Sequence, residues 1–108
     1  MKPQPWKYSD ATELIREMGK SKNLSLSFTD HCKQRLRERD LTISDVWYVL
    51  KNGFVFNEPE TATQNGFYKY QIESRTPNSN NRTVRLVIIP DYQDKCWIKL
   101  VTIMWADE

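Results

Sequence analysis

Residues 28–53 read FTDHCKQRLRERDLTISDVWYVLKNG and carry the start and stop signals of two consecutive helices. Thr29 is a typical N-cap, and Thr42 with Asp45 forms a T-x-x-D variant of the capping box. Gly53 supplies a C-terminal stop. The stretch therefore predicts one helix that begins after Thr29 and a second that begins after Thr42 and ends at Gly53.

The period of the hydrophobic pattern changes on both sides of this stretch. Upstream, residues 9–21 have apolar side chains at helical spacing, and residues 24–28 alternate as in a short strand or extended link. Downstream, four segments have the pattern of strands separated by short turns: 54–60, 67–74, 82–90 and 96–105. Helices are thus expected in the first half of the chain and strands in the second.

This order predicts an α+β fold in which two or three helices pack on one face of a curved antiparallel sheet of about four strands. The chain has 108 residues, which fits a single domain over residues 1–108. Residues 1–8 are expected to form a loose tail.

Composition excludes several classes of protein. No apolar run reaches the length that spans a membrane, and the N-terminal residues lack the apolar stretch of a secretory signal, so a cytoplasmic protein is expected. Cys32 and Cys96 do not make a disulfide framework or a zinc-binding pattern, which predicts free thiols. The net charge of +2 permits nucleic-acid binding without requiring it.

The first helix of the quoted stretch gathers the only histidine of the chain with three arginines, of which Arg37 is expected to face solvent. At about 100° per residue, Cys32 and Leu36 fall on the side that faces the core. His31, Arg35 and Arg39 fall along one border of that apolar stripe. Either the arginines bind carboxylates or carbonyls at the edge of the sheet, or they form an anion site for a phosphodiester.

The quoted stretch also resembles the opening signature of a family of small bacterial domains grouped with the BrnT and RelE-like toxins, H-[AC]-x-x-R-[ML]-x-E-R. The segments EPE, YKYQIE, VRLVIIP and VTIMW extend the resemblance over residues 24–105, although Asp40 stands where the pattern usually has glycine. The resemblance implies a RelE/barnase-like toxin fold. It also implies a metal-independent endoribonuclease that a cognate antitoxin holds inactive.

The residues suit cleavage of RNA by its own 2′-hydroxyl group. Such cleavage needs a base for the hydroxyl, cations for the extra negative charge and an acid for the leaving oxygen. His31 is the candidate for proton transfer, and Arg35 and Arg39 are candidates for binding the phosphate. Lys69 and Tyr70 are further catalytic candidates, since an amine or phenol with a lowered pKa can act as a base. No cluster of metal ligands is evident in the sequence, so no cofactor is expected.

Strand alternation adds candidates for RNA binding. Lys69, Arg85 and Lys99 are expected on the sheet face away from the helices, together with Phe67, Trp97 and Trp105. Cations among aromatic rings are typical of surfaces that bind single-stranded RNA. The predicted RNA-binding residues are Arg82, Arg85, Lys99 and Trp105. The alternative is that these cations are solvated outward positions and that the tryptophans close a second small core.

The leading hypothesis is therefore a toxin whose partners are RNA, free or on the ribosome, and an antitoxin protein, with no membrane involved. The first rival is a non-catalytic module that binds nucleic acid or protein through a cleft lined by these same basic residues. The second rival is structural: His31, Arg35 and Arg39 would bridge helix and sheet.

Overall fold

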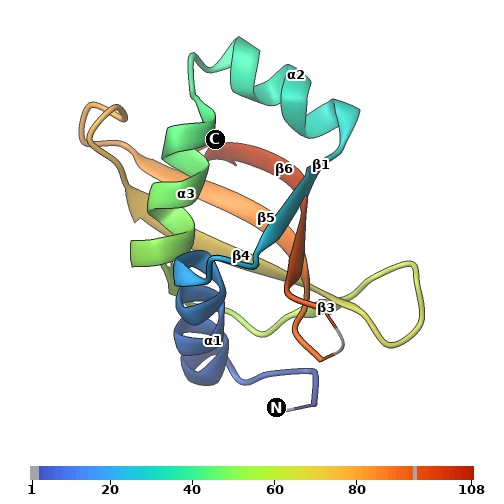
Figure 1. Ribbon diagram of the computed structural model, residues 1–108. Coiled ribbons are helices and arrows are strands. Elements are labelled where there is room, and N and C mark those ends of the chain that lie inside the picture. Colours follow the sequence, from blue (N-terminus) through green and yellow to red (C-terminus); the bar gives the residue numbers. More distant parts are fainter. Residues whose placement is uncertain (1–2, 94) are drawn as a thin grey trace.

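The computed structural model describes residues 3–93 and 95–108 and has three helices and six strands (Figure 1). Their bounds are α1 Tyr8–Lys20, β1 Ser25–Phe28, α2 Asp30–Glu38, α3 Ile43–Asn52, β2 Phe54–Val55, β3 Glu60–Thr61, β4 Tyr68–Arg75, β5 Thr83–Asp91 and β6 Trp97–Trp105. The predicted α+β class is confirmed. Among the described residues, no helix is both long enough and apolar enough to cross a membrane.

The sheet is larger than predicted and is mixed. Its strand order is β1-β6-β5-β4-β2, and the short β3 pairs with β4. Strands β4, β5 and β6 are antiparallel neighbours as expected, but β1 pairs with β6 in the parallel direction. The chain can enter β6 in this direction because α2, α3 and four further strands intervene between the two paired segments.

The core lies between one face of the sheet and the helices. On this face β4, β5 and β6 contribute fully buried side chains at alternate positions, among them Ile72, Leu86 and Leu100. Helices α1 and α3 cover that face with their C-terminal ends in contact, and α2 lies along β6 beyond the end of β1 (Figure 1). The opposite face carries side chains that are mostly half-buried, and we call it the outer face.

Both predicted helix caps are confirmed. Thr29 Oγ1 accepts a hydrogen bond from the Cys32 amide at 3.0 Å and donates one to the Val101 carbonyl at 2.7 Å, so it joins the start of α2 to β6. Thr42 and Asp45 form the capping box of α3. Asp45 also accepts a hydrogen bond from Thr76 Oγ1 at 2.6 Å, which anchors the β4–β5 loop.

The prediction of a loose tail at residues 1–8 is wrong for the part that the structure describes, residues 3–8; residues 1–2 lie outside it. The Trp6 side chain is buried, and its ring centroid lies 5.3 Å from that of Tyr70. The Trp6 amide donates a hydrogen bond to Tyr70 Oη at 2.9 Å, and Tyr70 Oη donates one to Gln4 Oε1 at 3.1 Å. An indole that buries this much apolar area holds the segment against the sheet.

A β-bulge changes the predicted alternation in β6. Val87 pairs with Thr102, whereas Ile88 pairs with Leu100, so Val101 is an extra residue between them. Trp97 and Lys99 lie on the outer face, but Trp105 pairs with Val84 and packs at the border of the core. The expectation that all of these β6 side chains share one face is therefore wrong beyond Val101, because a bulge reverses the faces that follow it.

Candidate functional site

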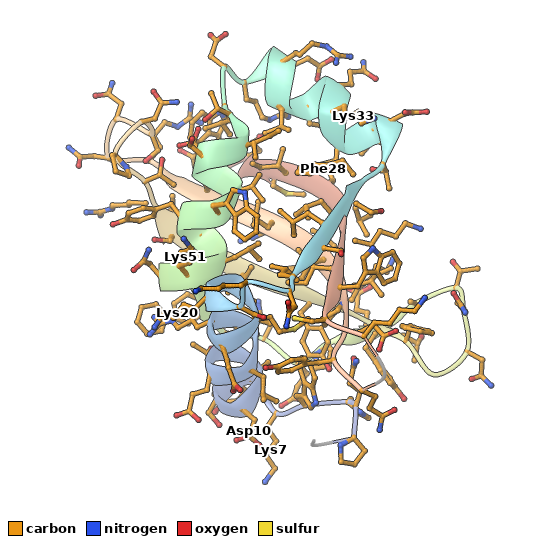
Figure 2. The ribbon with its side chains drawn as sticks, in the orientation of Figure 1. Lys7, Asp10, Lys20, Phe28, Lys33 and Lys51 are labelled. Atoms are coloured by element: carbon orange, nitrogen blue, oxygen red, sulfur yellow. The ribbon has the colours of Figure 1, made fainter. Side chains whose placement is uncertain are left out.

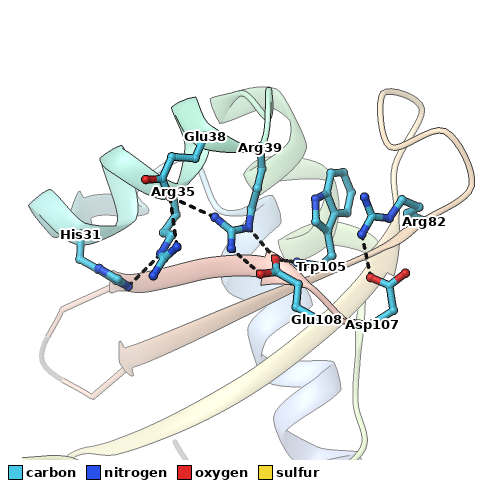
Figure 3. Close-up of polar contacts among 8 residues, drawn as sticks. All are labelled: His31, Arg35, Glu38, Arg39, Arg82, Trp105, Asp107 and Glu108. Atoms are coloured by element: carbon cyan, nitrogen blue, oxygen red, sulfur yellow. Dashed lines mark hydrogen bonds and ion pairs between the residues drawn. The ribbon is translucent and has the colours of Figure 1, made fainter.

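Helix α2 presents its histidine and two arginines along one border, as its spacing predicts. Cys32 and Leu36 are buried on the core side of the helix. His31 is exposed, and the side chains of Arg35 and Arg39 are 38% and 14% exposed. Figure 3 shows the three side chains in a row along the edge of β6, with Glu108 and Trp105 at the far end. We call His31, Arg35 and Arg39 the α2 row.

His31 and Arg35 contact each other directly. The Nε–H group of Arg35 donates to His31 Nε2 at 3.4 Å, and its Nη1 group lies 3.1 Å from Glu38 Oε1 (Figure 3). This contact engages the Nε2 atom of the imidazole, so a substrate hydroxyl group would have to replace Arg35 there before Nε2 could act as a general base. A guanidinium beside it is placed to meet an anion that approaches the imidazole.

Arg39 is held by two carboxylates. It forms a bidentate ion pair with Glu108 and a further contact of 3.3 Å with Glu38. Glu108 also accepts the Trp105 amide at 2.7 Å. The hydrogen bond from Arg39, with that from the Trp105 amide, lowers the pKa of Glu108 from 4.5 to about 2, and the same pair raises the pKa of Arg39. This pairing is what a mostly buried guanidinium requires.

Arg82, predicted to bind RNA, extends from the β4–β5 loop to the same end of β6. Its guanidinium lies 2.8 Å from Asp107 Oδ1 and 4.2 Å from the centroid of the Trp105 ring (Figure 3). The hydrogen bond from Arg82 lowers the pKa of Asp107. Both arginines at this end are thus occupied by the carboxylates of residues 107 and 108.

The outer face brings together part of the predicted RNA-binding group. Ile89 pairs with Lys99, and the adjacent pairing of Tyr70 with Ile88 puts Lys69 beside Ile89, so the two lysines flank one isoleucine. Both lysines line a hollow of about 340 Å³ together with Phe67 and Trp97. This hollow is the second candidate site.

Two predicted members of that group lie elsewhere. Arg85 is on the outer face, but it is not among the residues that line the hollow and forms an ion pair of 2.8 Å with Glu73 on β4. Trp105 was expected beside Lys99 and instead lies towards the core, because of the bulge at Val101.

Tyr70 is unsuited to the catalytic role predicted for it. Its side chain is 0% exposed on the helix-facing side of β4, and burial raises the pKa of its phenol to about 12. A buried phenol that holds its proton this firmly does not contact RNA or act as a base near neutral pH.

The carboxylates of Asp107 and Glu108 are the part of the arrangement that the sequence did not reveal. A partner for Arg39 was expected, but the identity of that partner depends on how β6 ends beside α2. Among the described residues, no group of three or more His, Cys, Asp and Glu side chains is arranged to hold a metal ion.

Comparison with known proteins gives a family. The family model described as "Domain of unknown function (DUF4258)" matches residues 28–105, so the chain belongs to that family. The match runs from the end of β1 to the end of β6 and includes the α2 row and the lysine-lined hollow, but not Asp107 or Glu108. No curated protein and no solved structure matches the chain.

Proposed function

We propose that this member of the DUF4258 family is a metal-independent endoribonuclease toxin of a bacterial toxin–antitoxin pair, with a fold of the RelE/barnase-like type. One observation carries the proposal: an exposed imidazole on α2 contacts the guanidinium of Arg35, and the guanidinium of Arg39 lies further along the same row. A base and two cations within one row are what cleavage by an internal 2′-hydroxyl needs.

In the proposed reaction, His31 Nε2 takes the proton of a ribose 2′-hydroxyl group. The 2′-oxygen then forms a bond to the adjacent phosphorus, and the bond from phosphorus to the 5′-oxygen breaks. The imidazolium returns the proton to that 5′-oxygen, so the products carry a 2′,3′-cyclic phosphate and a 5′-hydroxyl. Arg35 and Arg39 stabilise the negative charge that develops on the phosphoryl oxygens.

This mechanism requires an exchange of partners at Arg39. In the structure its guanidinium is bonded to Glu108, so a phosphate has to displace that carboxylate before Arg39 can bind it. Among the described residues, Arg35 forms an ion pair only with Glu38 on the same helix, and we expect Arg35 to be the more available of the two. Arg35 is therefore assigned the main phosphate contact.

The pairing of the arginines with carboxylates favours a second candidate function. Glu38, Glu108 and Asp107 together occupy Arg35, Arg39 and Arg82, which suits a surface that is neutralised for stability. In that case the protein would be a non-catalytic module that binds RNA or protein through the lysine-lined hollow, and His31 would be dispensable.

The proposed partners are RNA, free or on the ribosome, and an antitoxin protein that covers the α2 row and the outer face. The proposed location is the cytoplasm, where both partners would be made.

A growth experiment distinguishes the two proposed functions. Bacteria would express the wild type, His31→Gln, Arg35→Ala or Lys33→Ala under tight induction, with matched soluble levels. Lys33 is exposed on α2 outside the row, so its variant controls for loss of charge (Figure 2). We expect arrest by the wild type and by Lys33→Ala, and relief by the other two.

Equal arrest by all four proteins would indicate that the catalytic residues lie in the lysine-lined hollow and not in the α2 row. Absence of arrest by the wild type would favour the binding module.

A further inference from the structure

The hollow on the outer face has the dimensions of a ligand site. Its volume of about 340 Å³ falls within the range of about 300–1,000 Å³ that is common for small-molecule sites. Strand residues form its floor, and Gln64 in the β3–β4 loop forms part of its wall. Thr29, the N-cap of α2, lies at its border, so the hollow adjoins the end of the helix that carries His31.

The hollow carries two positive charges. Lys69 and Lys99 flank Ile89, so their Cα atoms are separated by two strand spacings, about 10 Å. Both side chains are half-buried, and neither forms an ion pair with any described residue. Among the described residues, no carboxylate lines the hollow; Glu60 lies opposite Lys69 in the β3–β4 pairing but is not in ion-pair contact with it. Half-buried ammonium groups in this setting favour an anion between them.

Two aromatic rings complete the lining. Phe67 and Trp97 are both half-buried. Neither ring pairs with another ring among the described residues, in contrast to Trp6 and Tyr70. Aromatic faces beside cations are the surfaces on which unpaired bases stack.

We propose that this hollow is a subsite for one unpaired nucleotide of RNA, with the base against Phe67 and Trp97 and the phosphate between Lys69 and Lys99. The inference rests on the proposed ribonuclease function and deepens it, since it names where the substrate is held beside the α2 row. Stacking and phosphate contacts accept any base. The Gln64 amide, which also lines the hollow, is placed to form hydrogen bonds with the edge of that base.

The cations of the hollow and those of the α2 row differ in their ion pairing, and this difference suggests separate roles. The arginines at the row are already paired with carboxylates, whereas the lysines of the hollow are not. We expect an approaching strand to meet lysines without an ion-pair partner first at the hollow, which reaches Thr29 at the start of α2. We expect binding to depend on the lysines and cleavage to depend on the histidine.

The test is binding of a single-stranded 2′-O-methyl RNA of about ten nucleotides, a length within the range that single-stranded sites cover. Methylation blocks attack by the 2′-oxygen, so affinity is measured without turnover. The variants are Lys69→Ala, Lys99→Ala, Trp97→Leu and Trp97→Phe, and thermal melting checks that each is folded. The control is Lys20→Ala, because Lys20 lines a separate hollow between α1 and α3, near Lys51 (Figure 2).

Loss of the indole in Trp97→Leu is expected to weaken binding roughly 5- to 150-fold, the range found when a stacking side chain is removed, and Trp97→Phe is expected to restore most of it. Each lysine variant is expected to weaken binding and to lower the slope of log affinity against log salt by about 0.7, the value for one phosphate contact on a single strand. Lys20→Ala is expected to bind as the wild type does.

Absence of binding by the wild type would overturn the subsite. So would equal weakening by Lys20→Ala, or variants of Lys69, Lys99 and Trp97 that bind like the wild type.

The two proposals fail in distinguishable ways. Binding of the methylated strand without cleavage of ordinary RNA, free or on the ribosome, would contradict the nuclease and leave a nucleotide site that serves the binding module. Cleavage of ordinary RNA by a protein whose lysine and tryptophan variants bind normally would contradict the subsite alone.

Discussion

Asp45 connects two parts of the chain that the sequence shows separately. It caps α3 through Thr42 and holds the β4–β5 loop through Thr76 and Asn78. Burial disfavours its charged form, but the hydrogen bonds from Thr76, Thr42 and Asn78 outweigh that effect and lower its pKa. The cap was predictable because its partners are three residues apart, whereas the loop contacts depend on the folded chain.

Replacing Asp45 with asparagine should destabilise the protein by about 1–3 kcal/mol, the range for loss of a cap and of hydrogen bonds to a charged group. Urea unfolding at neutral pH measures the change. The control is Asp40→Asn, since Asp40 is exposed and its φ of 53° suits asparagine equally well. A loss no larger than that of the control would contradict the role given to Asp45.

Glu108 gives a prediction about pH. Its pKa in the folded protein is about 2, below the ordinary value of 4.5, so the carboxylate favours the folded state above pH 4.5 and loses that effect as the pH falls towards 2. The wild type should therefore be more stable than Glu108→Gln at neutral pH, and the gap should shrink over this window. Unfolding by urea at a series of pH values measures the gap.

The matched control is Glu13→Gln, an exposed carboxylate on α1, for which no such gap is expected. A gap between the wild type and Glu108→Gln that stays constant from neutral pH to pH 3 would show that Glu108 does not hold Arg39 in solution.

At the scale of elements, the helices were predictable and the sheet only partly so. The bounds of α2 and α3 follow from caps and apolar spacing within each segment. The parallel pairing of β1 and the extra residue at Val101 follow from contacts with distant strands. A local pattern carries no information about which strand lies next to it. The predicted sheet was therefore too small, and the prediction of the face on which Trp105 lies was wrong.

Gly53 marks the close contact between the end of α3 and strand β4. A Cβ atom at this position would lie 2.6 Å from the Val49 carbonyl oxygen, 2.7 Å from Ile72 Cγ1 and 2.9 Å from the Glu73 carbonyl oxygen. Gly53→Ala should therefore destabilise the fold by about 1–3 kcal/mol or more, as overpacking does. Chemical unfolding measures the loss.

Gly66 supplies the comparison for this prediction. A Cβ atom there would meet nothing within 4 Å, but its φ of +86° is a conformation that side chains disfavour, which costs about 1 kcal/mol. If Gly53→Ala costs no more than Gly66→Ala, crowding at the α3–β4 contact is not what requires the glycine.

At the scale of the whole molecule, the candidate site was predicted in two pieces. The α2 row followed from helical spacing, and Lys69, Lys99, Phe67 and Trp97 followed from strand alternation. The surroundings of these residues did not follow, because Arg39 pairs with Glu108 across most of the chain. Tyr70 likewise contacts Trp6, 64 residues earlier in the sequence. Residue types and local periods can be read from the sequence, while charge compensation depends on the assembled fold.

Cleavage of RNA by its own 2′-hydroxyl group, with His31 as the base, leaves characteristic ends on the products. The measurement that tests it most directly is analysis of the ends formed when the purified protein meets RNA, free or on translating ribosomes, with a metal chelator present at a level that leaves the ribosomes intact. We predict 2′,3′-cyclic phosphate and 5′-hydroxyl ends from the wild type and none from His31→Gln. Intact RNA, ends with a 3′-hydroxyl, or undiminished cleavage by His31→Gln would contradict this mechanism.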